Sequence, residues 1–196
     1  MTEKTTMQAI ANLVPHGARV LDLGCGDGAL LDHLQRHRGC TGYGVEIADD
    51  NVLACVRRRV DVIQLNLDEG LALFEDQSFD VVLQIDTLPH LRNAEVMLRE
   101  TARVGRAGIV SFPNFAHWPN RLSVLRGRMP VTRRLPYQWY DTPNIRVGTY
   151  KDFEALAHKN QLRILDSFGL QDGHTMRFMP NARAGTAVFH FDRGGI

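Results

Sequence analysis

An apolar run that leads directly into alternating glycines limits the folds that this chain can adopt. Residues 20–28 read VLDLGCGDG, and a stretch with helical spacing follows at 28–37. Glycine has no Cβ, so the backbone at these positions can turn sharply and can approach a ligand closely. The segment therefore predicts a buried strand, a ligand-binding turn and a helix, in that order.

The rest of the chain repeats this alternation of strand and helix. Apolar runs predict seven strands, at 20–23, 41–47, 60–65, 79–85, 108–112, 162–168 and 186–191. Helical stretches are expected at 7–14, 28–37, 49–57, 93–104 and 151–159, with a weak turn at 69–74. Such alternation predicts an α/β fold, a doubly wound and mostly parallel seven-stranded sheet with helices on both faces. No helical pattern separates the last two strands, so we expect the sheet to end in an antiparallel hairpin.

Residues 113–148, called the insertion below, interrupt this alternation. They contain five of the eight prolines and both tryptophans, and they show no clear helical or strand period. The insertion also holds six arginines against one acidic residue, Asp141, in a chain whose net charge is +1. Arginines with aromatics are typical of protein interfaces, of lids over anionic molecules and of single-strand nucleic-acid sites, while a purely structural flap is the fourth interpretation. We predict a single domain, 1–196, with an elaborated loop or lid at about 113–148.

Composition excludes several classes of protein. The 196 residues are 44% hydrophobic and 23% charged, as in an ordinary globular protein, and the near-neutral charge disfavours nucleic acid or a membrane surface as partner. No apolar run approaches the ~18–20 residues that span a bilayer, and no signal-peptide pattern is present at 1–10. The three cysteines form no C-x-x-C pair. We therefore expect a cytoplasmic protein with free thiols.

The spacing of the glycines and acids indicates what the turn binds. A dinucleotide-binding turn follows G-x-G-x-x-G, whereas Gly24, Gly26 and Gly28 here alternate, with Asp22 before them and Asp27 among them. Two carboxylates would repel a pyrophosphate and would suit a ligand with an ammonium group. At the ends of the next strands, Glu46 could take both hydroxyls of a ribose and the amide of Asn66 could address an adenine edge.

These motifs together resemble the class I S-adenosylmethionine-dependent methyltransferases. The resemblance rests on DLGCGDG at 22–28, the acid Glu46 and FDVV at 79–82. It implies a Rossmann-like fold and a bound S-adenosylmethionine or S-adenosylhomocysteine, with Asp22 and the loop glycines around the methionine part, Glu46 at the ribose, and Ile47, Asn66 and Leu67 at the adenine. The expected cofactor-binding residues are Asp22, Gly24, Cys25, Gly26, Gly28, Glu46, Ile47, Asn66, Leu67 and Ile85.

A closer resemblance covers nearly the whole chain and includes the insertion. The runs DEGL at 68–71, IVSFPNFAHW at 109–118, RGRMPVT at 126–132 and LPYQWYDTPNI at 135–145 are similar to the MetW family of methionine biosynthesis proteins. The resemblance implies a methyltransferase-fold protein that works with a homoserine O-acyltransferase, of acetyl or succinyl type. It names no methyl acceptor.

The sequence shows no obvious catalytic machinery. Methyl transfer from a sulfonium depends mainly on positioning and desolvation, so the absence of a triad excludes nothing. Asp86 and His90, after the fourth predicted strand, are weak candidates for a general base. His33 and His37 have a spacing that can bind a metal, but no third ligand lies near them in sequence, and no metal is expected.

Two hypotheses follow. In the first, the protein binds S-adenosylmethionine and docks on a homoserine O-acyltransferase as a regulatory subunit, partly through the insertion. In the second, it is a methyltransferase that acts on a small-molecule acceptor. A concave acceptor pocket near Asp86, His90 and Asn114 would favour the enzyme, and aromatic side chains that fill that space would weaken it.

Overall fold

A computed structural model of the chain describes residues 2–194 and contains one eight-stranded sheet. Its strands are β1 (Arg19–Leu23), β2 (Thr41–Glu46), β3 (Val62–Gln64), β4 (Phe79–Ile85), β5 (Gly105–Pro113), β6 (Leu162–Gln171), β7 (His174–Met176) and β8 (Thr186–Arg193). The helices are α1 (Thr2–Ala11), α2 (Ala29–Arg38), α3 (Asp49–Arg58), α4 (Ala94–Val104), α5 (Trp118–Leu125), α6 (Tyr150–Lys159) and α7 (Pro180–Arg183). Two short 3-10 turns are η1 (Leu67–Glu69) and η2 (Leu88–His90).

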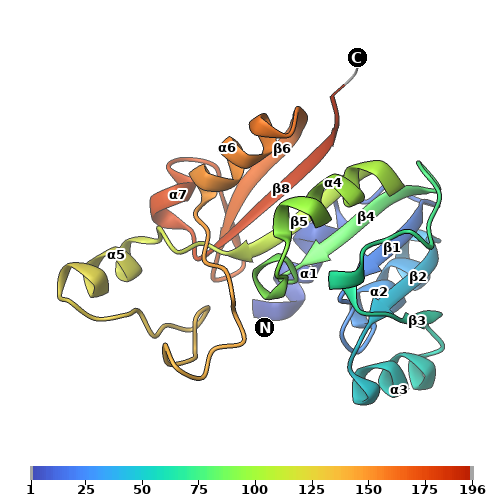
Figure 1. The fold of residues 1–196 in the computed structure, drawn as a ribbon, viewed down its shortest axis with the longest axis horizontal. Helices are drawn as coiled ribbons and strands as arrows, with labels where there is room; N and C mark the ends of the chain where they lie inside the picture. The colour runs from blue at the N-terminus through green and yellow to red at the C-terminus, as the bar shows by residue number, and fades with distance from the viewer. Residues whose placement is uncertain (1, 195–196) are drawn as a thin grey trace.

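The strand order is β3-β2-β1-β4-β5-β8-β6-β7 (Figure 1). The first five strands pair in parallel, and β8 lies antiparallel between β5 and β6. The predicted α/β class and the antiparallel C-terminal strands are therefore confirmed. The strand count was wrong by one, because the three-residue strand β7 is too short to show a period of two.

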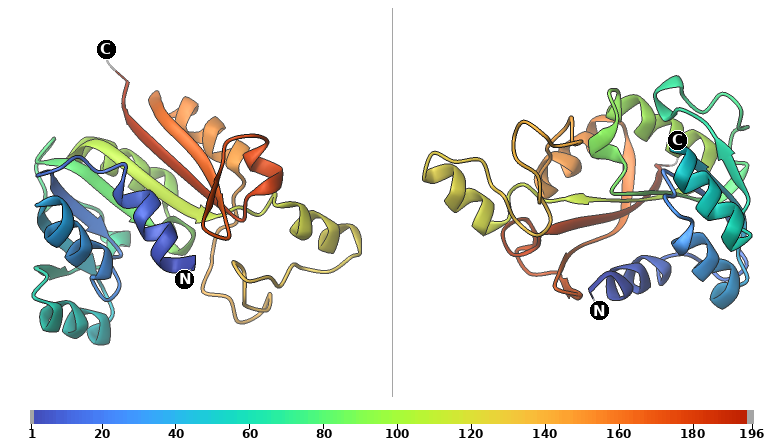
Figure 2. Two further views of the ribbon diagram at one scale, coloured as in Figure 1. Left: turned by 180° about the vertical axis from the view of Figure 1, so that it is seen from behind. Right: turned by 90° about the horizontal axis from the view of Figure 1, so that it is seen from below.

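Helices cover both faces of the sheet, with α1 and α2 on one face and α4 and α6 on the other (Figure 2). Successive side chains of a strand point to opposite faces. In β1, Leu21 and Leu23 join the apolar core under α4 and α6, whereas Val20 joins the core under α1 and α2. Asp22 lies at the same alternation as Val20, so it faces α1 and α2. This alternation aims a carboxylate at the side of the sheet where the glycine loop turns.

The insertion lies between β5 and α6 and projects from the sheet (Figure 1). It contains helix α5, which the sequence pattern did not predict. The helix has only eight residues and buries only Asn120, while Trp118 and Leu125 are 58% and 83% exposed. The single turn α7, between β7 and β8, was missed for its brevity.

No helix within residues 2–194 has the length and apolarity needed to cross a lipid bilayer.

Candidate functional site

The glycine loop after β1 contains three left-handed glycines with different surroundings. Gly24, Gly26 and Gly28 have φ of 74°, 56° and 76°. A Cβ on Gly24 would lie 2.6 Å from Thr87 Oγ1, and one on Gly28 would lie 3.0 Å from Cys55 Sγ, so these two positions are closed by packing. A Cβ on Gly26 would meet no atom within 4 Å. Gly26 is therefore the loop glycine that faces open space.

Glu46, at the end of β2, holds the loop in place. Its Oε2 accepts a hydrogen bond from the Gly26 amide at 2.9 Å, and its Oε1 accepts from the amides of Ile47 and Ala48 at 2.8 and 3.0 Å. A carboxylate offers about four lone-pair positions. Three are taken, which leaves a position on Oε2 for a ribose hydroxyl, the role that the sequence predicts for this residue.

Asp22 is a buried acid that lacks a full set of partners. Its side chain is 2% exposed, and Oδ1 has no hydrogen-bond partner in the described part of the chain. Burial, together with the nearby charge of Glu46, raises the pKa of Asp22 to about 7. A carboxyl group desolvated in this way is stabilised by a cation. Asp22 thus fits a ligand that carries an ammonium group.

The residues expected at an adenine lie at the ends of β2 and β3. Ile47 is 59% exposed, and Leu67 is buried at the start of η1. Asn66 Oδ1 accepts from the Asp68 amide at 3.1 Å, so its Nδ2 is the group left to donate to an adenine ring nitrogen. Because β2 and β3 are paired in parallel, these residues follow neighbouring strand ends, and their role at an adenine stays a prediction.

Cys25 turns its side chain into the protein interior. Its Sγ lies 3.8 Å from Cys55 Sγ, and burial raises the pKa of the Cys25 thiol. A protonated, enclosed thiol is unreactive. Cys25 was predicted to bind the cofactor, and with its side chain turned inward only its main chain is left for that role.

A cavity of about 680 Å³ lies beside the glycine loop, a size typical of small-molecule sites. It is bordered by the glycine loop, α1, the start of α2, the end of β4, the insertion and the β6–β7 turn. Its lining residues are Thr6, Met7, Ile10, Asp27, Ala29, Leu30, Ile85, Asp86, Arg133, Arg134, Leu170, Asp172, Gly173 and Thr186. None of these is aromatic, so the condition that would weaken the enzyme hypothesis is not met at Asp86.

Of the three residues expected around an acceptor, Asp86 alone lines this cavity. Asp86 has a φ of 57°; its Oδ1 accepts from Ser111 Oγ at 3.3 Å and its Oδ2 from Arg134 Nη2 at 2.8 Å. The exposed His90 lies on η2, with Nδ1 3.1 Å from the Pro143 carbonyl oxygen. The ion pair between Asp86 and Arg134 joins the insertion to the end of β4, a contact that sequence reasoning missed.

The side chain of Asn114 forms hydrogen bonds within the fold and does not line this cavity. It is 1% exposed, and its Nδ2 donates to the carbonyl oxygen of Ala184 at 2.8 Å. Its Oδ1 accepts from the amides of Ala116 and Tyr150, both at 3.2 Å. These bonds tie the start of the insertion to the first residue of α6, so the side chain of Asn114 is fully engaged.

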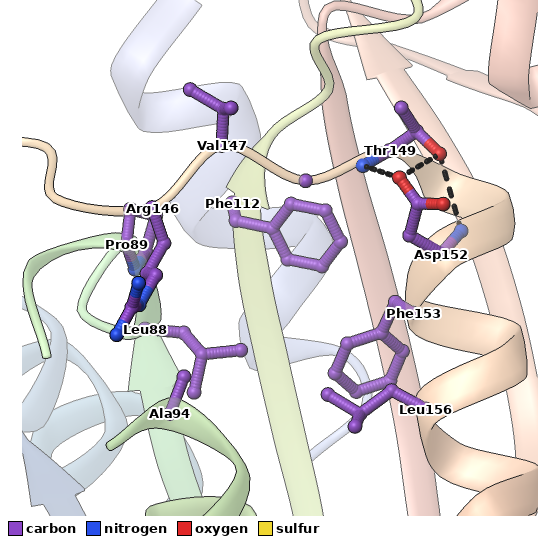
Figure 3. A pocket seen from close by; sticks show the side chains of 11 residues that line it. Leu88, Pro89, Ala94, Phe112, Arg146, Val147, Thr149, Asp152, Phe153 and Leu156 are labelled. Carbon is purple, nitrogen blue, oxygen red and sulfur yellow. Dashed lines mark hydrogen bonds between the residues drawn. The ribbon is translucent and has the colours of Figure 1, made fainter. Parts of the chain in front are cut away.

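A second, smaller cavity lies on the opposite face of the sheet (Figure 3). It measures about 190 Å³ and is mostly apolar, with Phe112, Phe153 and Leu156 on one side and Leu88 on the other. The Thr149–Asp152 capping box closes one edge. This hollow is too small for a nucleoside and suits an apolar side chain.

The paired histidines on α2 do not form a metal centre with neighbours. The rings of His33 and His37 are 4.6 Å apart, and residues 2–194 contain no group of three metal-binding side chains.

Comparison with known proteins gives both a family and a fold. A model of the family "Methionine biosynthesis protein MetW" matches residues 4–191. A curated relative, "Bifunctional methionine biosynthesis protein MetXA/MetW" of Rhodopirellula baltica, is 36% identical over 200 residues, which cover 95% of this chain and 32% of that protein. The chain thus spans about a third of the length of this relative.

Solved structures with low sequence identity share the fold. An S-adenosylmethionine-dependent methyltransferase from Thermotoga maritima superposes with a TM-score of 0.71 at 18% identity, over 97% of this chain and 88% of that one. Another from Mesorhizobium loti gives a TM-score of 0.70 at 14% identity, over 95% and 97%. The predicted class I methyltransferase fold is confirmed.

Proposed function

Because the chain belongs to the MetW family of methionine biosynthesis proteins, we propose that it binds S-adenosylmethionine at the glycine loop and acts with a homoserine O-acyltransferase. The observation that carries the cofactor part is Asp22, a buried carboxylate whose Oδ1 has no partner within residues 2–194. It lies directly before a loop whose central glycine faces open space. An ammonium-bearing ligand would satisfy the carboxylate and occupy that space.

Different residues of the chain would bind different parts of the cofactor. Asp22, Gly24, Gly26 and Gly28 would hold the methionine part, and Glu46 would accept from a ribose hydroxyl while it keeps the loop closed. Ile47, Asn66 and Leu67 would border the adenine, and Ile85 would contribute from the end of β4. When bound, the cofactor supplies an electrophilic methyl group.

The partner part of the proposal is supported by the insertion. Its exposed large apolar side chains include Leu125, Trp139 and Tyr140, at 83%, 72% and 70% exposed. Exposed apolar and aromatic groups together with arginines are typical of the interfaces that proteins form with one another. The Rhodopirellula baltica relative carries the names MetXA and MetW in one bifunctional chain, and such a fusion favours two parts that act together.

Methylation of a small acceptor is the second candidate function. The observation in its favour is the 680 Å³ cavity that reaches from the glycine loop to Asp86. Arg134 Nη2 donates to Asp86 Oδ2 at 2.8 Å and so occupies the position that an acceptor would need on this carboxylate. An acceptor that displaces Arg134 from Asp86, or one that is already nucleophilic, would remove this obstacle.

Calorimetric titration of the purified protein tests the proposal. S-adenosylmethionine and S-adenosylhomocysteine are titrated with and without a homoserine O-acyltransferase, and the activity of the acyltransferase is followed in parallel. Binding with altered acyltransferase activity and no loss of methyl over hours supports the regulatory subunit. Steady turnover to S-adenosylhomocysteine in a metabolite extract supports the methyltransferase, and absence of binding contradicts both.

A further inference from the structure

We propose that a groove on the insertion binds an acidic segment of the partner acyltransferase, with the carboxylates of that segment at Arg126 and Arg128 and one of its apolar side chains against Trp139. The identity of the partner rests on the proposed function, which the inference deepens by naming the chemistry that the partner presents. The evidence is the way in which the groove is built, the state of its two arginines and the composition of its wall.

The groove begins at the end of helix α5. Gly127 has a φ of 72°, a conformation that glycine adopts readily, and the Arg128 amide donates to the Ser123 carbonyl oxygen at 3.0 Å. This glycine cap places Arg126 and Arg128 on either side of Gly127 at the helix end. Both arginines line a groove of about 760 Å³. Residues farther along the insertion complete its wall, among them Met129, Val131, Gln138 and Trp139.

The two arginines of the groove differ from the other four arginines of the insertion. Two of those four pair with acidic residues outside the insertion and two donate to backbone carbonyl oxygens, in the order Arg133, Arg134, Arg121 and Arg146. The guanidinium groups of Arg126 and Arg128 have no hydrogen-bond or ion-pair partner within residues 2–194. Their charges are therefore left for a second molecule.

These two arginines are not needed to cap the helix. Arginine side chains at the end of a helix can bind the last carbonyl oxygens. Here the carbonyl oxygens of Leu122, Ser123 and Val124 accept instead from the main-chain amides of residues 126–128. Both arginines are exposed, so a partner can reach them without a change in the helix.

The wall of the groove combines positive charge with exposed apolar surface. No acidic residue is among the described residues that line it, so the two positive charges are not compensated locally. Met129, Val131 and Trp139 border the same groove and are 53%, 49% and 72% exposed. A segment that carries carboxylates next to an apolar side chain would neutralise the charges and bury the apolar groups together.

The same wall favours a protein segment over nucleic acid. Sites for single strands combine a basic groove with several aromatic rings, on which successive bases stack. Trp139 is the one aromatic residue among the described residues that line this groove, and Met129 and Val131 are aliphatic. Aliphatic groups suit an apolar side chain, and the net charge of +1 for the whole chain gives little general attraction for a polyanion.

Three labelled peptides test the chemistry of the groove by fluorescence anisotropy. The first has glutamates around a central phenylalanine, the second has serine in place of the phenylalanine, and the third has lysines in place of the glutamates. We expect the first to bind, the second to bind more weakly and the third not to bind. A tenfold rise in NaCl should weaken the first peptide, since salt screens exposed charges.

Two double variants test the residues. Arg126→Glu with Arg128→Glu should weaken both the glutamate peptide and the acyltransferase about tenfold or more, and should give the lysine peptide measurable affinity. Arg57→Glu with Arg106→Glu changes the net charge equally at exposed positions on α3 and β5 and is the matched control, which should bind as wild type does. Thermal unfolding shows that each variant is folded.

Several results overturn the inference. Equal binding of the three peptides, or an equal loss in both double variants, would mean that the groove has no preference of its own. Tighter binding of single-stranded oligo-dT than of the glutamate peptide, abolished by the groove variant, would make it a nucleic-acid site. A dimer in sedimentation that the groove variant dissociates would make a second copy of the chain the occupant.

The outcomes separate this inference from the proposed function. If the acyltransferase binds wild type and the groove variant equally, the proposed partner stands and the assignment of the groove fails. If the glutamate peptide binds through Arg126 and Arg128 while the acyltransferase does not bind at all, the chemistry of the groove stands and the proposed partner is wrong.

Discussion

The backbone groups around the glycine loop are hydrogen-bonded within the fold, whereas large apolar side chains of the insertion are exposed to solvent. Around the loop, Glu46 satisfies three backbone amides and Thr87 Oγ1 donates to the Leu23 carbonyl at 2.7 Å. In the insertion, large apolar groups such as Leu125 and Trp139 stay exposed. The loop therefore has a geometry that is complete before any ligand arrives, whereas the insertion presents a surface whose burial requires a second molecule.

The largest expected effect is on the unfolding free energy, which the buried carboxyl of Asp22 beside the loop lowers at high pH. Because the folded pKa of Asp22 is raised to about 7 from 3.8, the folded state holds this proton more tightly than the unfolded state does. The contribution of Asp22 to the unfolding free energy is therefore fully present below pH 4 and is lost as pH rises from 4 through 7. Asp22→Asn removes that loss, on the order of 4 kcal/mol, and should be more stable than wild type at pH 8 but not at pH 4. Urea unfolding between pH 4 and pH 8 measures the difference.

If the unfolding free energies of wild type and Asp22→Asn depend on pH in the same way, the burial of Asp22 has no stability cost and the expected effect is wrong. The gain in stability is expected to come with weaker binding of S-adenosylmethionine, since the amide lacks the charge that an ammonium needs. Asp141→Asn, at an exposed acid of the insertion, is the control and should leave the pH profile unchanged.

The second effect tests whether the loop is held by one side chain. Glu46→Ala leaves the amides of Gly26, Ile47 and Ala48 without their acceptor and removes the predicted ribose contact. At about 1–3 kcal/mol for each unsatisfied group, we expect the affinity for S-adenosylhomocysteine to fall about 100-fold or more in calorimetry. Glu154→Ala, at an exposed acid on α6, is the matched control. Unchanged affinity in Glu46→Ala would remove the site assignment.

A third effect, on partner binding, addresses the insertion. Trp139→Ala should weaken binding to the acyltransferase by about 2 kcal/mol, as for a buried aromatic at an interface, and should leave the unfolding free energy within about 0.5 kcal/mol. Leu125→Ser should act in the same direction and more weakly. Leu73→Ser, at a leucine that is 66% exposed outside the insertion, is the matched control. A loss of fold stability in Trp139→Ala without loss of binding would make the insertion a structural flap.

The smallest expected effect tests whether the insertion responds to a ligand at the glycine loop. Both tryptophans, Trp118 and Trp139, belong to the insertion, so emission excited at the indole band reports on that segment alone. If the ligand acts on Arg134, which pairs with Asp86 beside the glycine loop, S-adenosylhomocysteine should produce a small change in this emission. The change should vanish in Arg134→Gln and persist in Arg128→Gln, at an exposed arginine of the insertion that does not line the cavity. A change of the same size in Arg134→Gln would mean that the insertion does not respond to the ligand through this residue.

The sheet could be predicted because its signals are local. Each of the strands from β1 to β6, and β8, has an apolar run, and the glycine loop has φ of 56° to 76°, a conformation that glycine adopts with less strain than other residues. The short strand β7 and the turn α7 contain three and four residues, too few for a periodic pattern. Helix α5 escaped prediction because it has only eight residues, stands in a segment rich in proline and contributes only Asn120 to the buried residues.

The site could be predicted less completely than the sheet. Asp22, Glu46 and Gly26 lie together as expected, since the carboxyl ends of parallel strands meet at one edge. The pairing of Arg134 with Asp86 joins residues 48 positions apart through an irregular segment, and no local pattern encodes such a contact. For the same reason Asn114 was expected near an acceptor, while its hydrogen bonds place it among the main chains of α6 and α7.

The two ends of the insertion lie next to each other. Asn114 forms a parallel bridge with Gly148, and the Phe115 amide donates to the Gly148 carbonyl oxygen at 2.9 Å. Because the insertion starts and finishes at one point of the fold, its length does not set the distance between β5 and α6. In engineering terms it is a cassette: a segment of another length could be placed between Asn114 and Gly148 while the sheet and its glycine loop are retained.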